Sequence, residues 1–224
     1  MKNVESLPRE FYLTDAMTVA KALLGKRLVH YSHEGTTVGV IVETEAYAGH
    51  DDAACHSYQR KLPRNDHRTN IMFHEGGHIY VYLIYGMYNC FNVVVNEVGN
   101  PEAVLIRALE PVEGLPLMAQ RRGIDISPGK RNDLVKLCGG PGKLCIAMGI
   151  TREHYGQDLC RNDSDGIIIT KGTTIADSDI AATPRINVDY AGEAGTWPYR
   201  FVIRESGFLS TRKFIQPDCR RHER

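Results

Sequence analysis

The sequence lacks a surplus of charge of either sign. Its 224 residues include 27 lysines and arginines against 27 aspartates and glutamates, so the formal net charge is zero. The net charge therefore predicts no general attraction to nucleic acid or to an anionic membrane, and any such binding would depend on local patches. Long apolar runs are also lacking, because none approaches the ~18 residues of a membrane helix. We expect no membrane partner.

Cysteine pairs with metal-binding spacing are absent as well. Six cysteines are present, but no two form a C-x-x-C pair, so a zinc ribbon is unsupported. Residues 1–13 lack the apolar core of a signal peptide, and we therefore expect reduced thiols rather than disulfides. The sequence predicts a cytoplasmic or otherwise intracellular protein, in the nucleoid or nucleus according to the organism.

Neither an internal repeat nor a low-complexity linker divides the chain. A hydrophobic share of 42% in 224 residues is typical of a globular domain with a sizeable core. We expect one domain over residues 1–224, with its core at about 8–205 and a basic C-terminal tail at about 206–224.

Alternating apolar residues and turn signals predict two hairpins, at residues 26–47 and 77–96. Further strands are expected at residues 103–111, 166–170 and 198–204. Helices are expected at residues 14–25, 111–122 and 132–137 and after Pro141. Strands and helices do not alternate as βαβ units, so the expected fold class is α+β. We expect a curved, mainly antiparallel sheet with surrounding helices and a protruding hairpin.

The stretch IVETEAY at residues 41–47 alternates like a half-buried strand but carries two carboxylates. Glu43, Glu45 and Tyr47 are spaced by two, so their side chains share one face of the expected strand. His56 follows after a polar bend. A carboxylate, a tyrosine and a histidine gathered in this way indicate a functional site.

The turn of the second hairpin has an unusual composition. Hairpin turns favour Asn, Asp and Gly, yet Tyr85, Met87 and Tyr88 surround Gly86 here. Large apolar side chains exposed at a turn indicate a surface that touches a partner. The alternative is that the tip folds inward and belongs to the core.

Two further features are compatible with anion binding. The polar segment 48–71 is either a solvated surface or a binding site, and its basic residues are Arg60, Lys61, Arg64 and Arg68. A Gly-Pro start to a helix, followed by Lys143, could hold a phosphate. An ordinary helix start explains the same residues, because Leu144 breaks the P-loop spacing.

Several motifs occur here in the order found in one known family. They are VETEAY, DDAACHS, the PRN of KLPRND, YVYLIYGMYNCFNV, LIRALEP and GPGKLC. Over about residues 8–205 the chain resembles the alkyladenine (3-methyladenine) DNA glycosylase family. The resemblance implies a base-excision-repair enzyme that flips a damaged purine out of duplex DNA. Such an enzyme hydrolyses the N-glycosidic bond with an activated water and leaves an abasic site.

The resemblance also implies the substrates of the enzyme, its partner, and an activity that needs no metal or cofactor. The expected lesions are alkylated or deaminated purines of the class of 3-methyladenine, 7-methylguanine, hypoxanthine and ethenoadenine. The expected partner is double-stranded DNA containing such a lesion, bound by a monomer. Neither a metal nor a cofactor is implied, and the expected glycosylase is monofunctional, with no lyase activity.

The resemblance assigns roles residue by residue. Glu45 would be the general base that activates water, and Arg107 would orient that water and the groups around it. The residues expected to line the base pocket are Tyr47, His56, Tyr82 and Asn92. The residues expected to intercalate into DNA or contact it are Tyr85, Met87, Tyr88, Arg64 and Lys143.

These roles agree with the chemistry of the residue types. Flipping costs a few kcal/mol of stacking and pairing, and an aromatic wedge such as Tyr85 can offset that cost by filling the gap. Aromatic rings favour cationic bases such as 3-methyladenine. Departure of the base builds positive charge on the sugar, which a nearby carboxylate stabilises. One carboxylate suffices for an activated leaving group, so we expect Glu43 to be structural.

Two other functions remain open at this point. A metal-dependent hydrolase could use a cluster of possible ligands, although their spacing matches no motif such as H-E-x-x-H. The possible ligands are His50, Asp51, Asp52, His56, His74 and His78. A non-catalytic damaged-DNA-binding module of the same fold would keep the wedge and the pocket, but it would have no need for Glu45 as a base.

Overall fold

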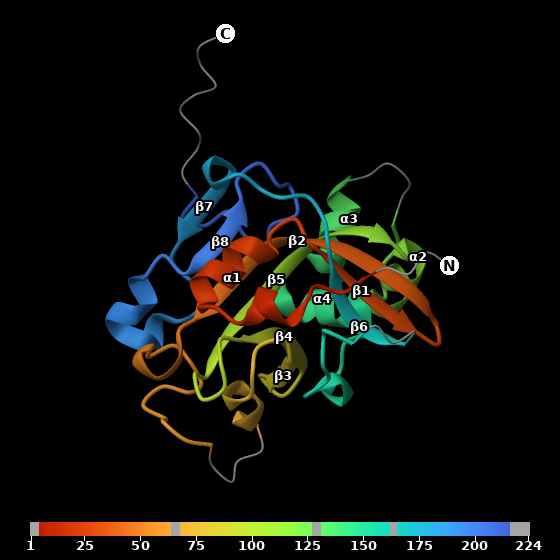
Figure 1. Ribbon diagram of the computed structural model, residues 1–224. Coiled ribbons are helices and arrows are strands. Elements are labelled where there is room, and N and C mark those ends of the chain that lie inside the picture. Colours follow the sequence, from red (N-terminus) through yellow and green to blue (C-terminus); the bar gives the residue numbers. More distant parts are fainter. Residues whose placement is uncertain (1–4, 64–67, 127–130, 162–164, 216–224) are drawn as a thin grey trace.

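A computed structural model describes residues 5–63, 68–126, 131–161 and 165–215 of the chain. Within these ranges, eight strands form one open antiparallel sheet with helices around it (Figure 1). The strands are β1 (Arg27–Ser32), β2 (Gly35–Tyr47), β3 (Ile79–Ile84), β4 (Tyr88–Val95), β5 (Glu102–Glu113), β6 (Gly166–Thr170), β7 (Ile180–Thr183) and β8 (Arg200–Ile203). The expected α+β fold is confirmed.

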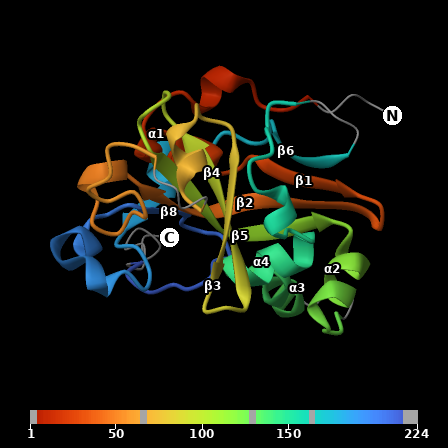
Figure 2. The ribbon, with the colours of Figure 1, turned by 90° about the horizontal axis from the view of Figure 1, so that it is seen from below.

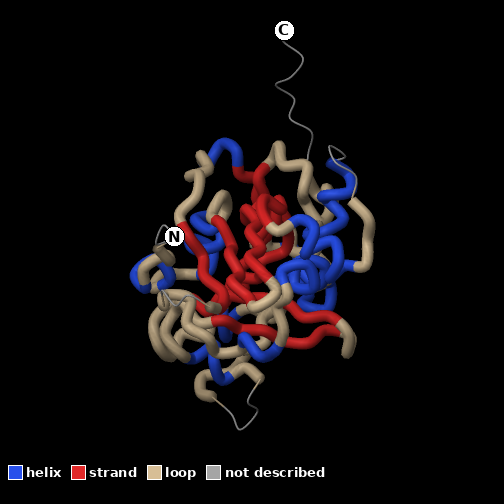
Figure 3. Tube along the Cα trace, turned by 90° about the vertical axis from the view of Figure 1, so that its right-hand side faces the viewer, coloured by secondary structure: helices blue, strands red, loops and turns tan. Residues whose placement is uncertain are grey.

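The helices and helical turns surround the strands, as Figure 3 shows with helices in blue and strands in red. The α-helices are α1 (Ala16–Leu23), α2 (Leu115–Arg122), α3 (Arg131–Cys138) and α4 (Pro141–Met148). Short 3₁₀ segments occur at Arg9–Tyr12, Gly49–Asp51, Asn70–Phe73, Arg152–His154, Asp177–Asp179 and Asp189–Thr196. No helix in the described ranges is long and apolar enough to cross a membrane.

Strand β2 is central and changes its neighbour along its length. β5 runs along one side of it, whereas on the other side β1 pairs with its first half and β8 pairs with residues 43–45. The pairing with β5 is irregular on both sides of Glu43. Such a bulge bends a strand and re-aims a side chain. Ile41 therefore lies in the hydrophobic core, while Glu43, two residues later, binds Arg107.

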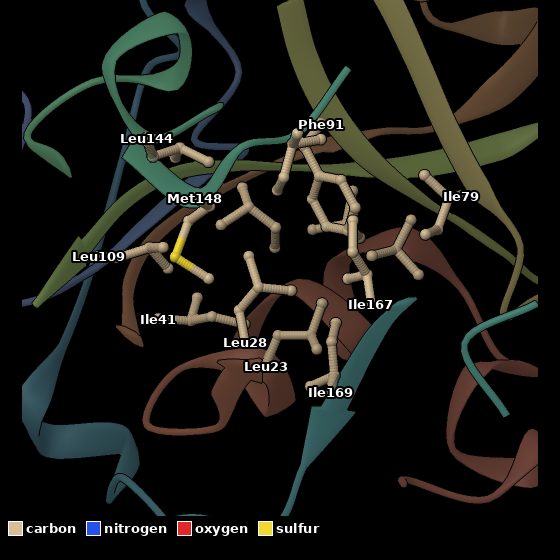
Figure 4. Packing of buried hydrophobic residues seen from close by; sticks show 14 of the residues in the cluster. Leu23, Leu28, Ile41, Ile79, Phe91, Leu109, Leu144, Met148, Ile167 and Ile169 are labelled. Atoms are coloured by element: carbon tan, nitrogen blue, oxygen red, sulfur yellow. The ribbon is translucent and has the colours of Figure 1, made fainter. Parts of the chain in front are cut away.

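The largest hydrophobic core joins the sheet to α1 and α4. Asp15 caps α1 by accepting a hydrogen bond from the Thr18 amide at 3.0 Å. The helix then buries Ala16, Val19, Ala20 and Leu23, at the spacing of one helical face. Figure 4 shows Leu23 of α1, Leu28 of β1 and Met148 of α4 in the same cluster.

Strands β3 and β4 form the expected second hairpin, drawn in yellow in Figure 2, where its turn reaches the lower edge of the molecule. β4 also pairs with β5, and β5 pairs with β2. Three neighbouring strands therefore bring Asn92, Leu105 and Glu45 into one row across the sheet. This row links the hairpin to the carboxylate-bearing strand.

The structure differs from the sequence expectations at two places. β5 continues to Glu113, so α2 begins at Leu115 rather than near residue 111. Gly114, with φ +76°, makes the sharp change of direction between them. β7 was not expected, because its four residues form a strand only by pairing with β8.

Residues 206–215 lie against the sheet. Phe208 and Leu209 are buried in a second hydrophobic cluster with Val42 and Val202. Of the basic residues expected in a C-terminal tail, Arg212 and Lys213 belong to this segment. Residues 216–224 lie outside the described residues.

The main core should dominate the stability of the fold. Leu28 is fully buried, so Leu28→Ala should lower the free energy of unfolding by about 2–5 kcal/mol through lost burial and a residual cavity. Leu62 is 74% exposed, and Leu62→Ala should change the free energy by less than about 0.5 kcal/mol. Urea unfolding followed by circular dichroism measures both, and equal effects would contradict this assignment of the core.

Candidate functional site

A small cavity lies between the β3–β4 hairpin and the segment that follows β2. Its volume is about 40 Å³, which leaves room for only a few water molecules. The residues that line it are Tyr47, Ala54, Cys55, His56, Met72, Tyr80, Tyr82, Asn92, Ala103 and Tyr190. The structure thus brings together all four side chains expected to line a base pocket.

Glu45 lies behind Tyr47 and is completely buried. Its Oε2 atom accepts hydrogen bonds from the Tyr47 hydroxyl at 2.9 Å and from Arg107 Nη1 at 3.2 Å. Its Oε1 atom accepts a hydrogen bond from the Ile186 amide at 2.7 Å. Burying a carboxylate is costly without such donors. The alternation of β2 therefore produces a carboxylate held from three directions.

Arg107 lies in the middle of β5 and joins the two glutamates. Its Nε atom donates to Glu43 Oε1 at 2.9 Å, while Nη1 binds Glu45. Burial alone would lower the pKa of Arg107, but attraction to Glu45 and Glu43 raises that pKa above its ordinary value. A fixed positive charge therefore sits beside Glu45.

Glu43 is fully buried and bound by two further residues. Arg200 Nε donates to it at 2.8 Å, and Ser210 donates through its amide at 2.6 Å and its hydroxyl at 2.7 Å. Burial by itself would raise the pKa of Glu43, but Arg107 and Arg200 outweigh burial and lower the pKa below its ordinary value. Glu43 lines no part of the cavity, which suits a supporting carboxylate.

His56 forms one wall of the cavity and is held in a single tautomer. Arg68 Nη2 lies 3.1 Å from His56 Nε2, and a guanidinium can only donate, so Nε2 accepts. The ring proton is therefore on Nδ1, which donates to the Tyr80 hydroxyl at 2.8 Å. Burial, with repulsion from Arg68 second, lowers the pKa of His56 to about 4. The ring is neutral at neutral pH.

Arg68 is an exposed residue that contacts two residues of the cavity wall. Besides its contact with His56, its guanidinium carbon lies 5.4 Å from the centre of the Tyr82 ring, within the range of a cation–π contact. The Tyr82 and His56 rings are 4.6 Å apart and nearly perpendicular. A cation is therefore already seated on the aromatic wall. Arg64, the arginine to which the resemblance gave a DNA contact, lies outside the described residues.

A buried ion pair anchors the loop that carries His56. Asp52 accepts hydrogen bonds from the Ala48 and Ala54 amides and from the Arg185 guanidinium. Asp52 and Arg185 are both buried, and the Arg185 guanidinium carbon lies 4.9 Å from the centre of the Tyr47 ring. The loop and the ring that lines the cavity are thus fixed by one arginine.

The suggested metal ligands are dispersed. Asp52 is bound to Arg185, and His50 contacts the neighbouring Asp51 at 3.2 Å. His74 and His78 lie ring against ring. In the part of the chain that the structure describes, no group of three or more His, Cys, Asp or Glu side chains is placed to hold a metal ion.

The hairpin tip points into solvent. Tyr85 is 74% exposed, Met87 69% and Tyr88 42%, so the alternative of an inward-folded tip is wrong. Tyr85 and Gly86 have φ of 54° and 69°, as tight hairpin turns require. A tyrosine with positive φ is strained, and such strain often persists at functional sites. The strain is consistent with a role for the Tyr85 side chain in binding rather than in stabilising the fold.

The start of α4 lies beside this hairpin. A Cβ atom added to Gly142 would be 3.0 Å from Tyr88 Cβ, so the glycine permits the close approach. Lys143 follows at once and is exposed. Lys143 therefore follows a residue that packs against Tyr88 of the hairpin.

Several residues of the site were missed from the sequence. Tyr80 could have been found, because it precedes Tyr82 by two positions on the same strand. Arg68 was noted only as part of a basic cluster. The Ile186 amide, Arg200 and Ser210 carry no local signal, since they reach the site from 141 to 167 residues away along the chain.

Comparisons with known proteins point to one family. The sequence model of the methylpurine-DNA glycosylase (MPG) family matches residues 10–207. A relative from Bacillus cereus (strain G9842) is 47% identical over 206 residues, which cover 91% of this chain and 98% of the relative. One from Clostridium novyi (strain NT) is 44% identical over 208 residues, covering 92% and 99%. Both carry the provisional name 3-methyladenine DNA glycosylase.

The neutral state of His56 leads to a pH prediction. In an NMR titration the His56 ring should gain its proton near pH 4 rather than near its ordinary 6.5. The unfolded chain binds that proton first, so the stability that His56 contributes is lost as pH falls from about 6.5 toward 4. Arg68→Ala should raise the pKa only partly, because burial is the larger cause.

A matched control is Arg161→Ala, which removes an exposed arginine outside the cavity lining. It should leave the titration of His56 unchanged. A wild-type midpoint near 6.5 would show that the ring is not desolvated as described.

Proposed function

Since the chain belongs to the methylpurine-DNA glycosylase family and is thus a DNA glycosylase for alkylated bases, we propose that it flips a damaged purine out of duplex DNA and hydrolyses its N-glycosidic bond with one activated water. The observation that carries the proposal is the buried Glu45 carboxylate, which accepts a hydrogen bond from the cavity residue Tyr47. The hairpin that contributes Tyr82 to the same cavity exposes Tyr85 at its tip. The product is free base and an abasic site.

Glu45 acts as the general base. As the bond to the base breaks, positive charge develops on the sugar, and a carboxylate close to it both stabilises that charge and takes a proton from the attacking water. Arg107 and the Ile186 amide restrict the carboxylate to one orientation. Water is the nucleophile in this scheme, so we propose a monofunctional enzyme without lyase activity.

The cavity selects damaged purines by charge and shape. The rings of Tyr47 and Tyr82 attract a cationic alkylated base, and a neutral His56 does not repel it. A cavity of about 40 Å³ cannot hold a purine, so the base replaces the Arg68 guanidinium against the Tyr82 ring. Asn92 is 3% exposed and donates to the Tyr80 and Cys90 carbonyls, which fixes its amide against a guanine 2-amino group.

The exposed tip supplies the wedge. Tyr85 enters the gap left by the flipped base and offsets part of the few kcal/mol that unstacking costs. Met87 and Tyr88 contact the neighbouring DNA, and Lys143 meets a phosphate. Because the net charge is zero, these local contacts carry the affinity of a monomer for duplex DNA, and that affinity falls steeply with salt.

The role of Glu45 can be tested by single-turnover excision in EDTA. Four duplexes would each carry one lesion: 3-methyladenine, 7-methylguanine, hypoxanthine or ethenoadenine. Glu45→Gln should slow excision by at least about a thousandfold through loss of the base, while binding to the damaged duplexes persists. The wild-type rates also rank the lesions.

Glu102→Gln is the matched control. Glu102 is a partly buried carboxylate that accepts hydrogen bonds from the Ala16 amide and Asn96, and burial raises its pKa. This variant should excise normally. Binding without excision by the wild type would favour the non-catalytic module, and activity lost only in EDTA would favour a metal-dependent hydrolase.

The wedge can be tested at the hairpin tip. Tyr85→Ser removes the ring that fills the gap, so binding to lesion-containing duplex should weaken by roughly tenfold, the value of about one stacking contact. Val98→Ser, which alters a 71% exposed apolar residue in another turn, should not change it. Fluorescence anisotropy measures both, and equal binding by wild type and Tyr85→Ser would remove Tyr85 from this role.

A further inference from the structure

The segment 208–213 is tied to the buried charges of the site. Phe208 and Leu209 are buried against the sheet, and the next residue, Ser210, reaches Glu43 with two donors. Its amide binds Glu43 Oε2 at 2.6 Å, and its hydroxyl binds Oε1 at 2.7 Å. Both oxygens of Glu43 are therefore held by one residue.

Arg200 fastens the same segment from β8. It is fully buried, and its Nε atom donates to Glu43 Oε1 at 2.8 Å. Its Nη2 atom donates to the Thr211 carbonyl at 2.6 Å and its Nη1 atom to the Lys213 carbonyl at 3.2 Å. One guanidinium thus joins the segment to Glu43.

The Ser210 hydroxyl also meets Arg107. Its single proton goes to Glu43, because Arg107 Nη2, at 3.4 Å from the same oxygen, can only donate. Arg107 is then held at three nitrogens: Nε by Glu43, Nη1 by Glu45 and Nη2 by Ser210. Three acceptors in different directions fix both the position and the plane of a guanidinium.

We propose that Ser210 is a positioning residue for base excision: through its hydroxyl it holds Glu43 and Arg107 in the arrangement in which Arg107 contacts Glu45. The inference rests on the proposed function, since it assumes that Glu45 is the general base. Ser210 lies three residues beyond the end of the family match at residue 207.

The physical reason is that the chemistry requires one orientation of Glu45. A misplacement of about 1 Å can cost a hundredfold in rate. Without the hydroxyl, Arg107 Nη2 loses its acceptor and Glu43 Oε1 loses one of three donors. The guanidinium is then held at two nitrogens instead of three, and its hydrogen bond to Glu45 is less well oriented. The wedge and the aromatic walls lie elsewhere, so DNA binding should be spared.

The experiment compares three variants in single-turnover excision of the best of the four lesions. Ser210→Ala should slow the reaction by about tenfold, the effect of one hydrogen bond to a charged group. Ser210→Thr keeps a hydroxyl and should restore the rate to within about twofold. Ser206→Ala is the matched control. It removes a nearby hydroxyl, two residues before this segment, that accepts a hydrogen bond from the Phe208 amide at 3.2 Å and forms no hydrogen bond with Glu43 or Arg107 among the described residues.

Two further readouts separate positioning from simple loss of structure. Binding to a duplex with an abasic-site analogue should change by less than about twofold in Ser210→Ala. In an Arg107→Gln background, adding Ser210→Ala should cause no further slowing, because the effect passes through Arg107.

The outcomes separate the two proposals. A further tenfold loss in the Arg107→Gln background, or equal slowing by Ser206→Ala, would overturn the role of Ser210 and leave the proposed function intact. A wild-type protein that excises none of the lesions would overturn the proposed function, and the role of Ser210 with it.

Discussion

Four buried charges hold the site together. Arg200, Glu43, Arg107 and Glu45 alternate in sign along a chain of hydrogen bonds, and none is more than 7% exposed. Removing such groups from water costs several kcal/mol each unless every one has partners. This series of hydrogen-bonded charges therefore persists only while β2, β5, β8 and the segment after β8 all stay in place. The site is therefore complete only when these four elements are packed together.

The irregular course of β2 also follows from the need to place these charges. β2 must face the core at Ile41 and the charges at Glu43, and a strand of strict alternation cannot do both. The irregular pairing around Glu43 resolves this conflict, and it coincides with the exchange of β1 for β8 as neighbour. The backbone irregularity is thus a consequence of placing Ile41 in the core and Glu43 beside Arg107.

The sequence predicted the parts of the site that local rules govern. Alternation placed Glu45 and Tyr47 on one face, and turn chemistry singled out Tyr85 at an exposed tip. The partners of Glu43 could not be predicted in this way, because Ser210 lies 167 residues away and acts partly through its backbone amide. A backbone donor is available at almost any residue, so no sequence pattern marks it. Strand β7 was not predicted for a similar reason, because its four residues form a strand only by pairing with β8.

The order of the four charges also bears on the proposed chemistry. They sum to zero, so the cluster exerts little long-range field, in keeping with a chain of zero net charge. Their arrangement is polar, however: Glu45 lies at the cavity end, and Arg200 lies at the far end against the Thr211 and Lys213 carbonyls. In the proposed reaction, a buried array of this kind would present its negative end to a cationic base and then to the sugar as it gains positive charge. Because the dipoles are already oriented, no reorganisation is needed when the bond breaks. On this account, the rigidity of the four hydrogen-bonded charges would itself increase the rate of base excision.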